Sequence, residues 1–326
     1  MKKTSMRSPL LLLLTATIWG VAFVAQSVGM DYVEPFTFNF VRCIIGGAVL
    51  IPCVALLDWL KKRDRAAGRT DKAERSDAVG QAASAPCIDE RQTGKRVRRG
   101  DRTLLTGGVC CGIALCIASN LQQFGIQYTS VGKAGFITAM YIVLVPVFSI
   151  FLDKKAGKRV WLSVLLAVAG LYLLCITDGF SVNFGDFLVL LCAVAFTVHI
   201  LIIDYFSPRV DGVRMSCIQF FVCGILSGVG MLIFESPSLE AIAQAWLPIG
   251  YAGVMSCGVA YTLQIVGQKG MNPTVASLIL SLESVVSVLA GWVILGENLS
   301  AKELFGCVLM FVAIILAQMP EKRETK

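Results

Sequence analysis

A carboxylate lies near the middle of a long apolar run in this sequence. Glu283 occurs in "SLILSLESVVSVLAGWVILGE", residues 277–297. An acid at the centre of a membrane helix costs about 2.5 to 3.5 kcal/mol, and its side chain lies too deep to reach water. Glu283 is therefore expected to face the interior of a helix bundle or a wet cavity. There it could bind a substrate amine or carry a proton, or it could be a protonated acid that ties two helices together.

One basic residue also lies well inside an apolar run. Arg42, in "NFVRCIIGG", cannot readily lose its proton, so it needs an anion or carbonyl oxygens as partners. It could bind a substrate carboxylate or pair with Glu283. Alternatively, its side chain could extend outward to the membrane surface, because Pro35 is close by. If Arg42 and Glu283 line one cavity, a zwitterionic amino acid would suit both.

Several further polar residues within apolar runs fall at helical spacing. Asn120 and Gln123 are three residues apart and share a helix face, with Gln122 on the neighbouring face. Tyr261 and Gln264 repeat that spacing further along the chain. Such side chains either line a polar cavity or hold helices together by hydrogen bonds.

A histidine, a tryptophan and the cysteines complete the set of candidates. His199, the only histidine, could carry a proton or be a hydrogen-bonded packing residue. Trp19 could be a cavity wall or a core residue. Eleven of the 12 cysteines lie in apolar runs, where free cysteine packs as a small hydrophobe, and only Cys87 lies in a polar segment. No Cys/His spacing resembles a metal site, and we expect neither a metal nor a cofactor.

The composition fixes the class of protein that must position these residues. Hydrophobic residues make up 56% of the 326 and charged residues 16%, with a mean hydropathy of +0.72. A soluble chain is nearer half apolar and a quarter charged. The apolar runs are long enough for membrane-spanning helices. The sequence therefore predicts an all-α integral membrane protein.

Ten apolar segments are candidates for membrane spans. They are 9–29, 35–59, 103–126, 131–152, 160–176, 186–206, 215–234, 244–267, 273–295 and 301–319. Cytoplasmic loops retain Lys and Arg, and an N-terminus inside the cell would put 26 of the 29 basic residues on the inner side. Only Lys133 and Lys302 would then lie outside, with Arg42 within a span. We therefore expect ten spans in the cell membrane, with both termini cytoplasmic.

The segment 61–102 differs from the rest of the chain. It is charged, rich in Ala and Gly, and almost free of large apolar side chains, so we expect a disordered cytoplasmic loop. Its thirteen basic residues could contact anionic lipid headgroups. Its seven acidic residues make a nucleic-acid partner improbable for a tethered loop.

The chain also contains an internal repeat. Sliding the sequence along itself until Tyr141 meets Glu283 aligns the third and fourth spans with the eighth and ninth without a gap, and it brings Gln122 to Gln264. A longer shift, which brings Arg42 to Gln219, pairs the first span loosely with the sixth. Each half has an odd number of spans, so the halves would enter the membrane from opposite sides. Inverted repeats around a central cavity are typical of secondary transporters.

Two long segments resemble a known family. Residues 134–174 ("AGFITAMYIVLVPVFSIFLDKKAGKRVWLSVLLAVAGLYLL") and 272–318, with "LES" at Leu282–Ser284 and "LGE" at Leu295–Glu297, resemble the EamA-type domains of the drug/metabolite transporter superfamily. The resemblance implies a first repeat over 9–176 and a second over 186–319. It also implies a central cavity and transport of amino acids, other metabolites or drugs, often outward.

The sequence thus favours a secondary transporter that moves a small metabolite, such as an amino acid or a drug-like solute, across the cell membrane by alternating access. A passive channel or facilitator is the main alternative, because the sequence does not show gating. We find no catalytic motif, so an enzyme is not expected. A receptor would usually need an appended soluble domain.

Overall fold

The computed structural model describes most of the chain, namely residues 7–78, 90–129, 131–152, 157–175, 183–295 and 300–318. This described part is helical, without strands. Its elements are α1 (Arg7–Gly29), α2 (Pro35–Ala78), α3 (Glu90–Tyr128), α4 (Val131–Thr138), α5 (Tyr141–Ile150), α6 (Lys158–Cys175), α7 (Phe184–Phe206), α8 (Gly212–Phe234), α9 (Leu239–Gln244), α10 (Trp246–Tyr251), η1 (Ala252–Ala260, a π-helix), α11 (Tyr261–Gln268), α12 (Pro273–Leu280), α13 (Leu282–Ala290), η2 (Gly291–Leu295, a π-helix) and α14 (Ala301–Gln318).

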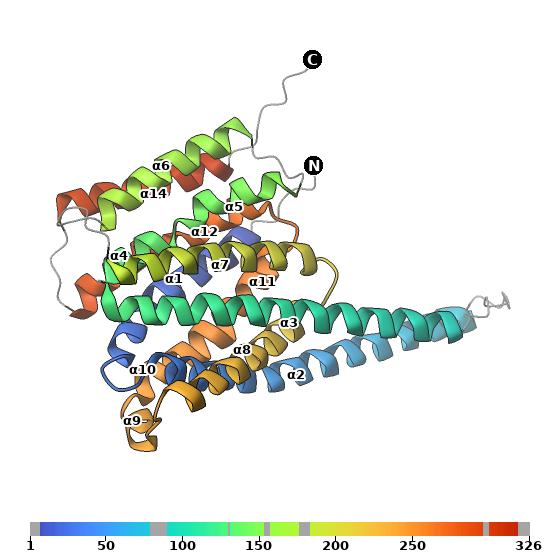
Figure 1. Cartoon of the computed structure of the whole chain (residues 1–326). Coiled ribbons are helices and arrows are strands. Elements are labelled where there is room, and N and C mark those ends of the chain that lie inside the picture. Colours follow the sequence, from blue (N-terminus) through green and yellow to red (C-terminus); the bar gives the residue numbers. More distant parts are fainter. Residues whose placement is uncertain are drawn as a thin grey trace, which may run out of the picture.

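The helices are those of a multi-pass membrane protein. Seven helical stretches in the described residues are long and apolar enough to cross a membrane, and two shorter apolar helices cover Ala134–Ile150 and Leu304–Ala317. The prediction of an all-α integral membrane protein is therefore confirmed. α6 and α14 pack against each other at one edge of the bundle, and α2 lies beside α8 at the opposite edge (Figure 1).

Two of the apolar segments are broken in the middle. The chain turns between α4 and α5 at Ala139 and Met140, and between α12 and α13 at Ser281. The Ser281 hydroxyl donates to the carbonyl of Leu278, which satisfies one of the free carbonyls at the end of α12. A new helix begins after each break, within the bundle. Tyr141 and Glu283 lie in the first turns of these two helices.

The boundaries of the helices repeat along the chain. We call the shift in residue number that aligns Arg42 with Gln219 the long shift. With this shift the bounds of α1 coincide with those of α7, and the start of α2 coincides with the start of α8. The shift that brings Tyr141 to Glu283, here called the short shift, carries α4 onto the bounds of α12, and it carries α6 onto α14 to within one residue. The same two shifts align the sequence, so the local structure follows the sequence repeat, breaks included.

The packing partners repeat as well. α1 packs on α12 and α13, and its counterpart α7 packs on α4 and α5. α3 packs on α7 and α8. Its counterpart, the segment from α10 to α11, packs on α1, and η1 within that segment also packs on α2. α2 packs on its own counterpart α8, and α6 on α14. These contacts are those of a bundle built from two related halves.

α2 and α8 are tied together at both ends. The Glu235 carboxylate, after the end of α8, accepts hydrogen bonds of 2.7 Å from the backbone N–H of Phe36 and of Thr37 at the start of α2. Asp58, in the last part of the α2 apolar run, accepts a 2.6 Å charged hydrogen bond from Arg214 at the start of α8. The end of α8 meets the start of α2, and the start of α8 meets Asp58 further along α2, so α2 and α8 are antiparallel. The long shift relates Asp58 to Glu235 and Thr37 to Arg214, so the two ties are equivalent.

The segment 61–102, predicted to be disordered, is helical in its described parts. α2 continues to Ala78 and α3 begins at Glu90, so both helices extend beyond the rest of the bundle (Figure 1). Ala, Arg, Lys and Glu are strong helix formers, and prolonging a helix that already exists avoids the cost of nucleation. The prediction of disorder is therefore wrong for 61–78 and 90–102. Residues 79–89, with Cys87, lie outside the described residues.

Replacing Glu235 should destabilise the protein more than replacing Asp58. Glu235→Ala removes the acceptors for two backbone N–H groups in the first turn of α2, and the loss of such a cap costs about 1 kcal/mol. Asp58→Ala removes an ion pair whose side chains are 41% and 34% exposed for Arg214 and Asp58, and exposed pairs contribute about 0 to 1 kcal/mol. The check is the thermal unfolding midpoint of each variant in the same detergent. A larger fall for Asp58→Ala would contradict this ranking.

Candidate functional site

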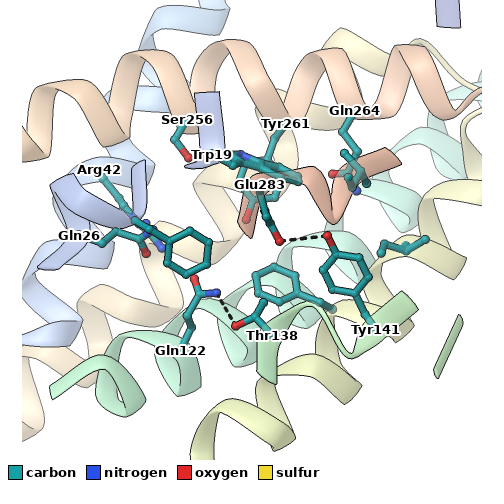
Figure 2. Close-up of a pocket in the computed structure, with 14 residues that line it drawn as sticks. Trp19, Gln26, Arg42, Gln122, Thr138, Tyr141, Ser256, Tyr261, Gln264 and Glu283 are labelled. Carbon is teal, nitrogen blue, oxygen red and sulfur yellow. Dashed lines mark hydrogen bonds between the residues drawn. The ribbon is translucent and has the colours of Figure 1, made fainter. Parts of the chain in front are cut away.

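A cavity lies at the centre of the bundle, where the two halves meet. The space outside the protein atoms there is about 490 Å³, part of which is open solvent, and helices from both halves line it (Figure 2). We call it the central cavity. Its lining residues are Trp19, Phe23, Gln26, Arg42, Gln122, Thr138, Tyr141, Phe196, Ile200, Ser256, Tyr261, Gln264, Leu280 and Glu283.

Glu283 and Tyr141 meet across the cavity. The Tyr141 hydroxyl donates a 3.0 Å hydrogen bond to Glu283 Oε1, and the side chains point toward one another in Figure 2. Both residues are almost fully buried, at 3% and 4% exposure for Tyr141 and Glu283. The short shift relates them, so equivalent first turns of the two halves deliver the donor and the acceptor. A first turn also favours a carboxylate, because the N-terminal end of a helix is positive.

Close contacts hold the Glu283 turn in place. Ser284 donates a 3.1 Å hydrogen bond to the carbonyl of Gly135, which ties α13 to α4. Gly20 brings α1 against the same turn, since a Cβ at that position would lie 2.7 Å from the carbonyl oxygen of Glu283 and 2.4 Å from Cβ of Val286. A larger residue at position 20 would therefore push α1 away from the cavity.

Arg42 lines the cavity without an anionic partner in the described part of the chain. It is 5% exposed, and its guanidinium lies 5.4 Å from the centre of the Phe38 ring. Its Nε has no hydrogen-bond partner among the described residues, where no ion pair joins Arg42 to Glu283. The predicted pairing of Arg42 with Glu283 is therefore absent here. A buried cation without a counter-ion is costly, so this position favours an anion in the cavity.

Other polar atoms of the lining also lack partners among the described residues. They are the donor Trp19 Nε1 and the acceptors Gln26 Oε1 and Gln264 Oε1. Gln122, by contrast, donates from Nε2 to the Thr138 hydroxyl at 3.2 Å. Gln264 is the repeat counterpart of Gln122, but Leu280 takes the place of Thr138 beside it. Leu280 cannot accept a hydrogen bond, so the contact between the Gln122 amide nitrogen and Thr138 has no equivalent at Gln264.

Aromatic rings form the apolar part of the wall. The Trp19 and Tyr261 rings pack with centroids 4.5 Å apart, and Phe220 supports Tyr261 from behind at 5.5 Å. Phe23 and Phe196 add further aromatic surface. The cavity therefore combines a few polar groups with apolar walls, as small-molecule sites commonly do.

Of the nine residues proposed from sequence, the structure brings six to the central cavity: Trp19, Arg42, Tyr141, Tyr261, Gln264 and Glu283. The other three lie in helix contacts. Asn120 is hydrogen-bonded to Asn39 and Ser227 at 2.8 and 3.0 Å, which joins α3 to α2 and α8. Gln123 donates to the carbonyl of Gln26 at 3.3 Å, which joins α3 to α1. His199 lies 3.2 Å from Gln219, behind the cavity wall.

Sequence reasoning did not select four polar residues of the lining, namely Gln26, Gln122, Thr138 and Ser256. For Gln122, the internal repeat contains the signal that could have identified it. Five pairs of lining residues are repeat counterparts: Trp19 with Phe196 and Phe23 with Ile200 by the long shift, and Gln122 with Gln264, Thr138 with Leu280 and Tyr141 with Glu283 by the short shift. Applying the repeat to Gln264 would have identified Gln122 in place of Asn120 and Gln123.

The described residues contain no group of three or more His, Cys, Asp or Glu side chains placed to hold a metal ion. The structure has no disulfide among the cysteines that it describes, and Cys43 and Cys223 lie in contact at 3.5 Å between α2 and α8.

Comparisons with known proteins identify the family of this chain. An uncharacterized transporter of Archaeoglobus fulgidus is 29% identical over 309 residues, which cover 94% of this chain and 84% of that protein. An uncharacterized transporter of Synechocystis is 23% identical over 342 residues, covering 98% and 92%. A solved crystal structure has the same fold, with a TM-score of 0.69 at 19% identity over 95% of this chain and 97% of the other. A model described as the EamA-like transporter family matches residues 6–71, 90–176 and 183–319, and this protein belongs to that family.

Proposed function

We propose that this membrane transporter is a secondary carrier that moves a small zwitterionic metabolite, such as an amino acid, by alternating access. The observation that carries the proposal is the central cavity itself. Within the described residues, it holds a guanidinium without a protein anion at Arg42 and a carboxyl group at Glu283, hydrogen-bonded to Tyr141. Arg42 would bind the substrate carboxylate, and Glu283 would bind its amine or carry a coupled proton.

The carrier would cross the cell membrane ten times, as two inverted five-helix repeats over 9–176 and 186–319. The matching helix bounds and packing partners of the two halves support this topology. The antiparallel contact of the equivalent helices α2 and α8 supports opposite orientations of the halves. The distribution of Lys and Arg supports cytoplasmic termini, which would also put the helical extensions of α2 and α3 in the cytoplasm, near anionic lipid headgroups.

Export is the direction implied by the family resemblance, and a channel or facilitator is the second candidate. The lining favours a carrier, because a buried fixed cation and a carboxyl group would hold a zwitterion at one place in the cavity. A conducting pore requires weak binding that lets the solute leave quickly.

Counterflow in proteoliposomes tests the proposal. Vesicles loaded with a mixture of unlabelled amino acids would receive one radiolabelled amino acid at a time from outside. A carrier gives transient accumulation of label that saturates with concentration. Flux that stays linear in concentration, without accumulation, would support a channel, and the absence of flux for every amino acid would rule out this substrate class.

Glu283→Gln should retain the fold and lose most transport, or lose the dependence of transport on pH. Glutamine has nearly the same volume and can still accept the hydrogen bond from Tyr141, but it cannot ionise. The measurement is counterflow over a range of pH, with membrane abundance and thermal midpoint as controls for folding. Wild-type activity at every pH would exclude a coupling role, and failure to accumulate in membranes would indicate a structural one.

Arg42→Gln should abolish discrimination between an amino acid and its decarboxylated amine. The lost guanidinium is the charged group of the lining suited to a carboxylate, so the half-saturating concentration of the amino acid should rise at least tenfold while competition by the amine changes little. Arg209→Gln is the matched control, because Arg209 is an exposed residue whose guanidinium lies over Tyr205, away from the cavity. Unchanged discrimination in Arg42→Gln would exclude carboxylate binding at this position.

A further inference from the structure

A second pair of buried polar side chains lies directly behind the wall of the central cavity. His199 Nε2 on α7 is 3.2 Å from Gln219 Oε1 on α8, and both residues are fully buried. His199 Nδ1 and Gln219 Nε2 have no hydrogen-bond partner in the described part of the chain. Buried polar atoms are nearly always hydrogen-bonded, and leaving one without a partner is destabilising. The pair thus uses only part of its hydrogen-bonding capacity in this structure.

Aromatic rings separate this pair from the cavity. The His199 ring centroid is 6.0 Å from that of Tyr261 and 6.5 Å from that of Phe196, and both of these rings line the cavity. Tyr261 is itself fixed between Trp19 and Phe220. Movement of the Tyr261 ring would therefore uncover the His199 ring toward the cavity.

The repeat gives one member of this pair, Gln219, a counterpart that already faces the cavity. The long shift relates Gln219 to Arg42, and Arg42 lines the cavity whereas Gln219 is covered. Gln26 is likewise a lining residue, while its counterpart Ile203 is fully buried. The lining thus extends further along α1 and α2 than along their equivalents α7 and α8.

The residue at the covering position also differs between the two halves. Tyr261 covers the pair, and its counterpart by the short shift is the small residue Ser119. In a carrier made of inverted repeats, the halves rock about a fixed site, so that surfaces covered in one state face the cavity in the other. The covered counterparts of Gln26 and Arg42 are the surfaces that such a movement would uncover.

We propose that His199 and Gln219 form a second polar subsite of the carrier, which Tyr261 covers in this structure and which joins the cavity when the opposite face opens. This inference rests on the proposed carrier function, and it assigns the subsite to the same zwitterionic substrate. The amide of Gln219 would donate to the carboxylate that Arg42 binds in the present state. A neutral donor binds a carboxylate less strongly than a guanidinium does, so the substrate would be held less tightly on this side.

His199 can be followed chemically because it is the only histidine of the chain. The probe is diethyl pyrocarbonate, which acylates an unprotonated imidazole nitrogen, applied to protein purified without a histidine tag and reconstituted in lipid vesicles. Modification of His199 is quantified by mass spectrometry of its peptide. In the wild type we expect complete modification at a rate at least tenfold below that of N-acetylhistidine, because the ring is uncovered only in the opposite-facing state.

Two variants in α11 separate uncovering from general loosening. Tyr261→Ala should accelerate the modification at least tenfold, because it removes the covering ring. Ile265→Ala is the matched control, since it truncates a fully buried side chain one turn away that packs in a different cluster, and it should leave the rate unchanged. Wild-type His199 that stays unmodified while the protein remains folded, or equal acceleration by both variants, would overturn the subsite.

Counterflow measured on the same vesicles separates this inference from the function on which it rests. If an amino acid shows counterflow but His199 is not modified, the carrier proposal is supported and the subsite is refuted. If His199 is modified but no amino acid shows counterflow, a movement that uncovers this pair is supported, and a zwitterion as its ligand is refuted.

Discussion

The absence of water within the membrane is the constraint on which this structure depends. Each polar group inside a span must find a partner in the protein or face a wet cavity. Most of the buried polar side chains solve this locally, as Asn120 does by joining three helices. Arg42 differs from the uncharged side chains, because no group in the described part of the chain neutralises its charge. An anion in the cavity that Arg42 lines would supply the missing partner.

Breaks in the helices allow the two halves to place side chains at the central cavity. An uninterrupted helix presents one face along its whole length, whereas a new first turn at the middle of the bundle offers a positive helix end and a changed side-chain direction. Tyr141 and Glu283 occupy such turns in the two halves and meet in a hydrogen bond of 3.0 Å. The contact between them thus joins equivalent elements of the repeat.

Much of this architecture can be predicted from the sequence, because apolar length, charge distribution and a repeat are properties of the whole chain. Single positions are harder. Spacing of three residues correctly places Asn120 and Gln123 on one helix face, but it does not say whether that face meets the cavity or another helix. The identity of Gln122 and Gln264 at equivalent positions is the better guide here, because equivalent positions of the two halves surround the same centre.

Local composition misleads for a different reason at the segment 61–102. A charged segment without large apolar residues cannot form a core, which argues for disorder when the segment is considered alone. Here it continues helices that the membrane spans have already nucleated, so propensity alone is enough to prolong them to Ala78 and back to Glu90. The error came from treating the segment as independent of its neighbours.

The two halves share a scaffold, so their differences carry the chemistry. If every equivalent pair were identical, the cavity would present the same groups in both states, and nothing would give it one preferred orientation of a substrate. Glu283 faces Tyr141, Leu280 replaces Thr138 beside Gln264, and Arg42 has Gln219 as its counterpart. These differences put charge and free polar atoms on particular sides of an otherwise repeated cavity. The repeat therefore accounts for the equivalent elements around the cavity, and the departures from the repeat determine which chemical groups line it.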